Sequence, residues 1–161
     1  MAKKPLGVRV LEQRNIPHTV VEFPDHIRSA TGVAEAADLG LHEVFKTLVV
    51  QTERAGAAPM LVLAPADISV DLKLLAAQVG AKKLHMASHR DAESLTRLKV
   101  GGISALALLQ KRWTVLIDQS TSERQEILVS AGVRGVDVRI AVNDFVALTG
   151  ARFAVLSERE S

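Results

Sequence analysis

The stretch Val44-Phe45-Lys46-Thr47-Leu48-Val49-Val50 combines β-branched, aromatic and aliphatic residues with one ammonium group near its start. This composition predicts a buried strand. A lysine in such a strand either extends its amine to water or serves a site, because burying an unpaired ammonium is costly. Taken by itself, the stretch favours a solvated Lys46.

Two hairpins are expected around this strand. Residues 60–64 read as its partner, because the intervening residues 53–59 contain Gly56 and Pro59 and resemble a loop. Residues 127–130 and 136–140 form the second strand pair. Helical patterns are interleaved with these strands, so we predict an α+β fold with a central mixed, mostly antiparallel sheet flanked by helices.

Side-chain caps and glycines predict where the helices begin and end. Expected caps at the starts of helices are Ser29 or Thr31, Asp71, Ser88, and Asn143 or Asp144. Expected left-handed helix ends are Gly40, Gly80 and Gly150.

Length and composition limit the function. With 161 residues, 48% of them hydrophobic, the chain is expected to form one domain over residues 1–161. The absence of cysteine excludes disulfides and thiolate chemistry, and the 3% aromatic content leaves little for base stacking. Without a signal-peptide pattern or a membrane-length apolar run, we expect a soluble, cytoplasmic protein with no membrane partner.

No metal site is predicted. His85 and His89 are four residues apart, but the expected helix start at Ser88 falls between them. Asp71 is better explained as a helix cap, and Asp67 lies in a turn. We therefore expect neither a metal nor another cofactor.

Two further features leave alternatives open. Gly101 and Gly102 can present backbone N–H groups to a phosphate or a carbonyl oxygen, or they can form a simple tight turn. Asp137 can orient a ligand in a pocket, or it can pair with Arg134 or Arg139 on a hairpin surface.

Four ordered motifs resemble those of the YbaK-type deacylases of the prolyl-tRNA synthetase editing-domain superfamily, over essentially the whole chain. The motifs are residues 45–50, residues 71–83, residues 100–104 and residues 130–137. The resemblance implies a free-standing domain that hydrolyses the ester of a mischarged tRNA, with Cys-tRNA(Pro) as the leading substrate. The implied partners are the acceptor end of aminoacyl-tRNA and prolyl-tRNA synthetase.

The resemblance also implies roles for individual residues. Lys46 matches the functional lysine that contacts the end of the aminoacyl-tRNA, and Gly101 and Gly102 match the loop that holds the terminal adenosine and the reacting carbonyl. These three residues are the expected catalytic residues. The expected substrate-binding residues are Ile103, Ser104, Ser130 and Asp137.

The chain departs from the family at two places. The family loop reads Gly-x-x-x-Pro, whereas Ala105 stands at the proline position. Residues 25–31 are expected to border the amino-acid pocket, and Thr31 stands near a position that often carries a larger apolar residue in this family. Ala105 suggests altered placement of the adenosine or altered amino-acid choice, and Thr31 bears on the preference for cysteine.

Three alternatives compete with a Cys-tRNA(Pro) deacylase. The first is a deacylase of different amino-acid specificity. The second is a non-catalytic module of the same fold that binds tRNA or a synthetase, suggested by Ala105 and the modest formal charge of +2. The third is a serine hydrolase that uses Ser104, although the chain has no G-x-S-x-G sequence.

Overall fold

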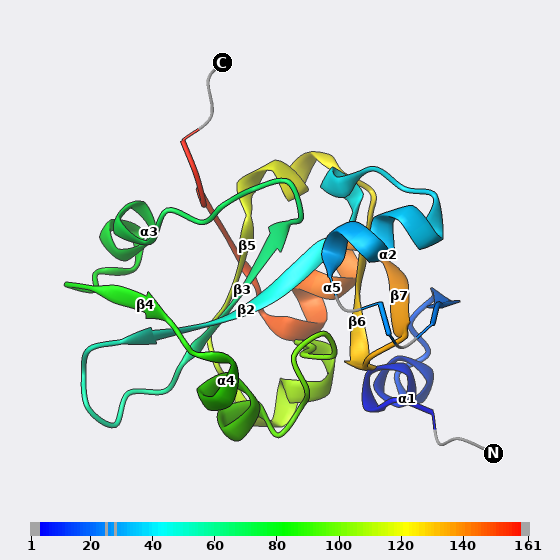
Figure 1. Cartoon of the computed structure of the whole chain (residues 1–161), viewed down its shortest axis with the longest axis horizontal. Coiled ribbons are helices and arrows are strands. Elements are labelled where there is room, and N and C mark those ends of the chain that lie inside the picture. Colours follow the sequence, from blue (N-terminus) through cyan, green and yellow to red (C-terminus); the bar gives the residue numbers. More distant parts are fainter. Residues whose placement is uncertain (1–3, 25, 28, 159–161) are drawn as a thin grey trace.

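The strands of this computed structural model, which describes residues 4–24, 26–27 and 29–158, fall into two sheets (Figure 1). A five-stranded sheet has the order β4-β2-β3-β5-β8 and a three-stranded sheet the order β1-β7-β6. The first consists of β4 (Leu84–Met86), β2 (Phe45–Thr52), β3 (Met60–Pro65), β5 (Val115–Asp118) and β8 (Arg152–Ala154). The second consists of β1 (His18–Glu22), β7 (Val136–Ala141) and β6 (Glu126–Val133).

The predicted hairpins and the mixed sheet are confirmed. β2 pairs antiparallel with β3 and with β4, and β6 pairs antiparallel with β7 and bends at an irregularity between Ser130 and Val133. β3 pairs parallel with β5, and β5 pairs parallel with β8. The parallel pairs arise because helical segments separate these strands along the chain.

Helices cover both faces of the five-stranded sheet (Figure 1). The α-helices are α1 (Leu6–Gln13), α2 (Ala30–Ala37), α3 (Leu72–Val79), α4 (His89–Thr96) and α5 (Val142–Thr149). Short 3-10 helices are η1 (Leu41–Glu43), η2 (Leu106–Lys111) and η3 (Gln119–Glu123). The α+β class with a mixed sheet and flanking helices therefore holds.

Most of the predicted helix ends are found. Ser29, Asp71 and Ser88 accept hydrogen bonds from N–H groups three residues later, as N-caps do. Gly80 and Gly150 end α3 and α5 with φ of 73° and 71°.

Two predicted helix ends are wrong. Asp38, not Gly40, adopts the left-handed conformation after α2, because a short acidic side chain also tolerates positive φ. Helix α5 begins after Ala141, so Asn143 and Asp144 lie inside its first turn and not at its cap.

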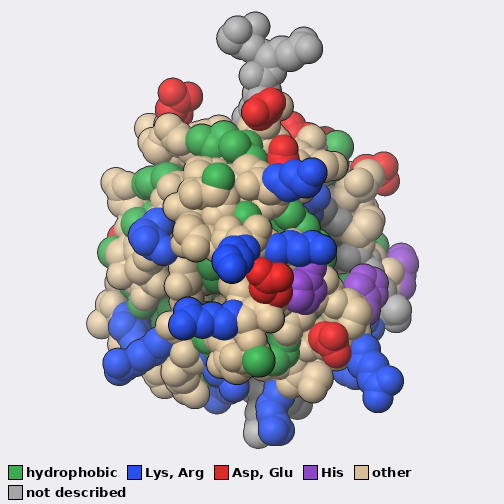
Figure 2. Space-filling view, turned by 90° about the vertical axis from the view of Figure 1, so that its left-hand side faces the viewer, with side chains coloured by type: hydrophobic (Ala, Val, Ile, Leu, Met, Phe, Trp, Pro, Cys, Tyr) green, Lys and Arg blue, Asp and Glu red, His purple; other side chains and the backbone are tan. Residues whose placement is uncertain are grey.

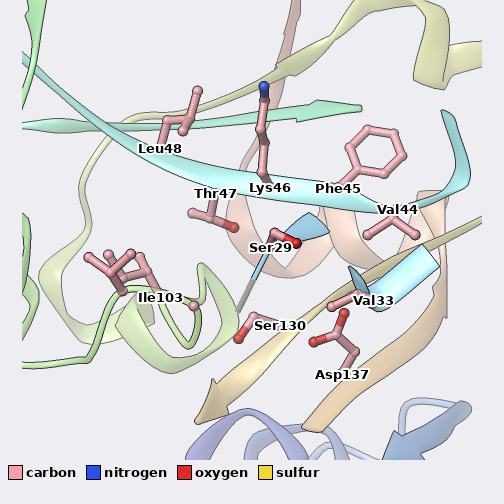
Figure 3. A pocket seen from close by; sticks show the side chains of 12 residues that line it. Ser29, Val33, Val44, Phe45, Lys46, Thr47, Leu48, Ile103, Ser130 and Asp137 are labelled. Atoms are coloured by element: carbon pink, nitrogen blue, oxygen red, sulfur yellow. The ribbon is translucent and has the colours of Figure 1, made fainter. Parts of the chain in front are cut away.

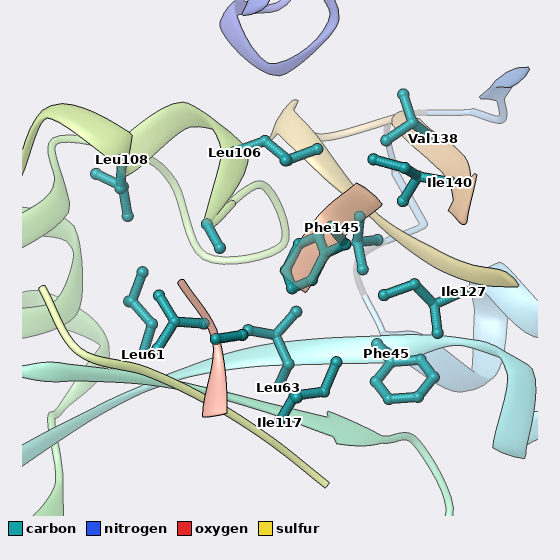
Figure 4. Packing of buried hydrophobic residues seen from close by; sticks show 14 of the residues in the cluster. Phe45, Leu61, Leu63, Leu106, Leu108, Ile117, Ile127, Val138, Ile140 and Phe145 are labelled. Carbon is teal, nitrogen blue, oxygen red and sulfur yellow. The ribbon is translucent and has the colours of Figure 1, made fainter. Parts of the chain in front are cut away.

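Alternation along β2 divides the core between two faces. Phe45 and Val49 join Leu63, Leu106 and Phe145 in the cluster between the sheets (Figure 4). On the other face, Leu48 and Val50 pack with the apolar side of α3. Because side chains of a strand alternate between faces, Thr47 belongs to the first face and Lys46 to the second.

Candidate active site

A pocket lies where the two sheets separate. Val44 and Leu128 form a parallel bridge that joins the start of β2 to β6, and the two strands diverge beyond it. The space between them has a volume of about 180 Å³ and is called the junction pocket here. Its lining residues are Ser29, Val33, Val44, Phe45, Lys46, Thr47, Leu48, Val100, Gly101, Ile103, Ser130 and Asp137 (Figure 3).

One wall of the junction pocket is an open strand edge. β4 pairs with β2 only over Val50–Thr52. The hydrogen bond from this segment nearest the start of β2 runs from the Ala87 N–H to the Val49 carbonyl. Backbone groups of alternate residues in an antiparallel strand point to the same edge. The N–H and C=O of Thr47 therefore face the open edge, where β4 no longer covers it.

Lys46 contributes to this wall, but its amine does not point at Asp137. The side chain extends on the side of the β2 ribbon opposite to Thr47, which points toward Ser29 and Ser130 (Figure 3). The Lys46 Nζ donates to the Ile68 carbonyl at 2.7 Å. Burial lowers the pKa of Lys46 from its usual value, and the nearby Asp67 charge acts in the opposite direction. The amine is thus held at Ile68, on the face of β2 opposite to Thr47, with two N–H donors beyond the one that Ile68 uses.

Asp137 lies on the opposite wall. It is paired in register with Ser130 across β6 and β7, and only 6% of its surface is exposed. Desolvation raises the pKa of Asp137 from 3.8 to about 7. Among the described residues, no group donates a hydrogen bond to the Asp137 carboxylate, and no cation lies within 4.0 Å of it. The surface ion pair with Arg134 or Arg139 is therefore not formed.

The two glycines play different parts in the loop between α4 and η2. Gly101 has a φ of 94° and lines the junction pocket. Gly102 is buried, and a Cβ there would lie 2.8 Å from the Val133 carbonyl carbon. The Gly102 N–H donates to the Lys99 carbonyl at 2.7 Å, so this donor is used inside the turn.

Neighbouring groups hold this loop from two sides. Glu93 on α4 accepts from the Val100 N–H at 2.8 Å, and this hydrogen bond is the main reason why the pKa of Glu93 is lowered. Arg134 donates through Nε to the Val100 carbonyl at 2.8 Å. Within the described part of the chain, the N–H groups of Gly101 and Ile103 donate to no protein acceptor. Both remain available to a ligand.

Ala105 preserves the backbone that the family proline would impose. Its φ is −63°, which is the value fixed by a proline ring, and its ψ is −33°. The departure from the family sequence therefore does not demand a different loop.

The structure brings together Lys46, Gly101, Ile103, Ser130 and Asp137 as lining residues of one pocket. Two expected residues do not line it. Gly102 is needed for the close approach to the β6–β7 turn, and Ser104 is 1% exposed with its hydroxyl accepting from the Ala107 N–H.

Sequence reasoning missed Thr47 and, apart from Ile103, the apolar lining residues. Thr47 could have been found, because a hydroxyl between Phe45 and Val49 interrupts an otherwise apolar strand face. Of the expected border at residues 25–31, Ser29 lines the junction pocket and Thr31 does not. Asp25 and Arg28 lie outside the described residues.

Metal clusters and membrane spans are not found in the part of the chain that the structure describes. These residues contain no group of three or more His, Cys, Asp or Glu side chains placed to hold a metal ion. No helix in the same ranges is long and apolar enough to cross a membrane.

Comparisons with known proteins agree with the resemblance seen in the motifs. The chain is 32% identical over 161 residues to EbsC of Enterococcus faecalis, covering 98% of this chain and 96% of EbsC. EbsC is provisionally named a Cys-tRNA(Pro)/Cys-tRNA(Cys) deacylase.

Solved structures show the same fold. One, provisionally described as a trans-editing enzyme for prolyl-tRNA synthetase, has a TM-score of 0.82 at 26% identity and covers 98% of this chain and 100% of its own. A solved hypothetical protein has a TM-score of 0.85 at 20% identity, covers 95% of this chain and 99% of its own, and supports the fold alone.

The family comparison covers the whole junction pocket. Residues 24–148 match the aminoacyl-tRNA editing domain family, and every lining residue falls within them. This chain therefore belongs to the aminoacyl-tRNA editing domain family.

Proposed function

We propose that this protein is a free-standing cytoplasmic deacylase that hydrolyses the ester of a mischarged tRNA, with Cys-tRNA(Pro) as its main substrate. The family match and the names of EbsC and the trans-editing relative support the reaction class. The observation that carries the proposal is a small pocket that combines an unpaired buried carboxylate with unused backbone N–H donors.

The size of the junction pocket suits an aminoacyl group. At about 180 Å³ it is smaller than the roughly 300–1,000 Å³ of pockets that enclose drug-sized ligands. Val33, Val44 and Ile103 supply an apolar lining for a small side chain, and Ser29 and Thr47 add hydroxyls. A nucleotide would have to remain outside.

Asp137 is the proposed partner of the substrate α-ammonium. An aminoacyl ester carries a free amino group, and a buried carboxylate without a partner gains most when such a cation enters. The paired charge also favours ionised Asp137. Ser130, its cross-strand neighbour, would contact the same end of the substrate.

Backbone donors are proposed to stabilise the developing oxyanion. The candidate donors are the unused N–H groups of Gly101 and Ile103 and the N–H of Thr47, which lies on the open edge of β2. An aminoacyl ester is already activated, so positioning and such donors supply much of the acceleration. The nucleophile, either water or the thiol of a cysteinyl substrate, bonds to the carbonyl carbon, and the ribose oxygen leaves and takes up a proton.

Lys46 is proposed to bind and not to act as a base. Its amine keeps one bond to Ile68 and offers its remaining N–H donors to phosphate or ribose oxygens of the terminal nucleotide. Gly102 and Ser104 are proposed to shape the loop through the contacts described above.

The non-catalytic module and the serine hydrolase receive less support from the structure. Ala105, which suggested a non-catalytic module, keeps the backbone angle of a proline. Ser104 is buried and its hydroxyl serves a turn, so a fluorophosphonate probe should not label it.

A deacylation panel tests the proposal. The protein is incubated with Cys-, Ala-, Ser- and Pro-charged tRNA, with and without prolyl-tRNA synthetase, and ester loss is followed against spontaneous hydrolysis. We expect the largest acceleration with Cys-tRNA(Pro). No acceleration with any of the four esters would contradict the proposed activity.

A further inference from the structure

A second recess lies at the other end of the five-stranded sheet. The start of β2 lies beside the end of β3 and borders the junction pocket, whereas Thr52 at the end of β2 borders a hollow near the start of β3. Thr47 and Thr52 are five residues apart, which corresponds to roughly 17 Å along a strand. The two recesses are therefore separate.

The surface around this end of the sheet is basic. Two adjoining hollows of about 580 and 560 Å³ share Ala81, Lys82 and Lys83. The charged residues that line them are Arg54, Lys73, Lys82, Lys83 and Arg152, with Glu53 as the acid, and we call these five cations the basic surface. Figure 2 views this side of the molecule and shows Lys and Arg side chains spread over much of it.

The cations of the basic surface are exposed and unpaired. In the described residues none of the five lies within 4.0 Å of a carboxylate, and the one ion pair there joins Lys4 and Glu12. Three separate segments bring them together: the β2–β3 loop with Arg54, the start of β8 with Arg152, and α3 with the turn that follows it. The dipole of α3 accounts for lysines after its C-terminus, but it does not account for Arg54 or Arg152.

The shape of the surface suits an extended polyanion. Small residues lie between the cations, among them Ala57, Gly80 and Ala81, and they leave the hollows in which phosphates can approach the amines. Aromatic side chains that could stack on bases do not line either hollow. This chemistry fits a phosphate backbone read without base contacts.

We propose that the basic surface binds the phosphate backbone of the tRNA body while the aminoacyl end occupies the junction pocket. This inference rests on the proposed deacylase function and adds to it a second contact region, roughly 17 Å away along β2. It assigns Lys82 and Lys83 to affinity for the full tRNA and not to the chemical step.

Charge reversal with a matched control tests the proposal. In the double variant Lys82→Glu and Lys83→Glu, the slope of log affinity for tRNA against log salt should decrease by about 2, and affinity at low salt should fall by about tenfold. The control, Arg9→Glu with Arg14→Glu, makes the same change in net charge at exposed residues of α1 and just after it, at the other end of the molecule (Figure 1). Equal slopes and affinities for the two double variants would overturn the proposal.

Hydrolysis separates the binding surface from the activity. The Lys82/Lys83 variant should lose kcat/KM on full mischarged tRNA, but it should match the wild type on an aminoacyl-adenosine fragment too short to reach the basic surface. If the wild type bound tRNA through the basic surface but hydrolysed no ester, the deacylase function would be refuted and the basic-surface proposal would be retained. If the wild type hydrolysed the ester and the Lys82/Lys83 variant had the same kcat/KM on full tRNA, only the basic-surface proposal would be refuted.

Discussion

The two walls of the junction pocket treat their ionisable groups differently. On the β2 wall, the Lys46 amine is partly buried but donates to the Ile68 carbonyl. On the β7 wall, the Asp137 carboxylate is more deeply buried and receives no hydrogen bond from the described residues. In the described residues the Lys46 amine has a hydrogen-bond partner and the Asp137 carboxylate has none, which supports the proposal that Asp137 binds a ligand.

This difference matters because an unpaired buried carboxylate is a cost to the folded protein. Such a cost is retained where it serves binding or catalysis. Removing the charge on the β7 wall should therefore stabilise the protein and damage its activity, whereas removing the charge on the β2 wall should mainly weaken binding.

Asp137→Asn should have the largest effect. We expect a loss of about 100-fold in kcat/KM for a mischarged tRNA, because the α-ammonium loses its charged partner. Single-turnover ester hydrolysis measures this, with Asp38→Asn as the control at an exposed residue whose positive φ an asparagine tolerates. Activity within twofold of the wild type would remove Asp137 from the site.

The free energy of unfolding should depend on pH in the wild type through Asp137, and Asp137→Asn should remove this dependence. Since the folded pKa of about 7 exceeds 3.8, protonated Asp137 stabilises the folded state below about pH 4, and this stabilisation is lost as the pH rises to about 7. The full difference corresponds to at most roughly 4 kcal/mol. Urea unfolding at pH 5 and pH 8 should show this loss in the wild type and not in Asp137→Asn; parallel losses in both would contradict the raised pKa.

Lys46→Met should have the next largest effect. The substitution keeps the aliphatic stem and removes the charged donor, so kcat/KM should fall about tenfold, mainly through KM. Lys111→Met is the control, since the Lys111 amine lies 5.7 Å from the centre of the Trp113 ring and outside the pocket. A fall in kcat with an unchanged KM would show that Lys46 acts in the chemical step instead.

Thr47→Val tests the part of the β2 wall that faces Ser130. The near-isosteric change removes one hydroxyl and keeps the backbone N–H, so we expect a loss of about threefold to tenfold in kcat/KM. Thr19→Val, on the exposed strand β1, is the control. Full activity in Thr47→Val, with reduced activity in Asp137→Asn, would limit the substrate contact to the β7 wall and the backbone.

Ala105→Pro should have the smallest effect. Because Ala105 already has a φ of −63°, proline should be accepted and should raise the free energy of unfolding by about 0.4–1 kcal/mol. Urea unfolding measures the gain, and deacylation should stay within about twofold of the wild type. A strong loss of activity would show that the loop between α4 and η2 depends on conformational freedom at this position.

Local sequence patterns predicted much of the fold. Ser29, Asp71 and Ser88 were recognisable as caps because each can accept an N–H three residues later, and the hairpins followed from loops between apolar runs. The division into two sheets was not predictable in this way. It depends on the Val44–Leu128 bridge and on the parallel pairing of β3, β5 and β8, which join residues far apart in the chain.

The candidate site was predictable in composition more than in geometry. The four motifs indicate that Lys46, Gly101, Ser130 and Asp137 share one pocket, and the structure places all four in its lining. The motifs do not show that Gly102 uses its N–H inside the turn, or that Ser104 is buried away from the pocket. Those outcomes depend on packing against the β6–β7 turn.

By itself, the sequence determined that this chain carries the motifs of the aminoacyl-tRNA editing domain family and that its core is mainly aliphatic, with Phe45 and Phe145 as aromatic exceptions. Only the tertiary structure decided which charge is satisfied. Ile68 reaches the Lys46 amine because the segment after β3 folds back beside β2, and Asp137 stays unpaired because Arg134 is directed to the loop at Val100 instead. Whether a charge is paired depends on which distant segments pack beside it in the tertiary structure, and the spacing of residues along the chain does not determine this.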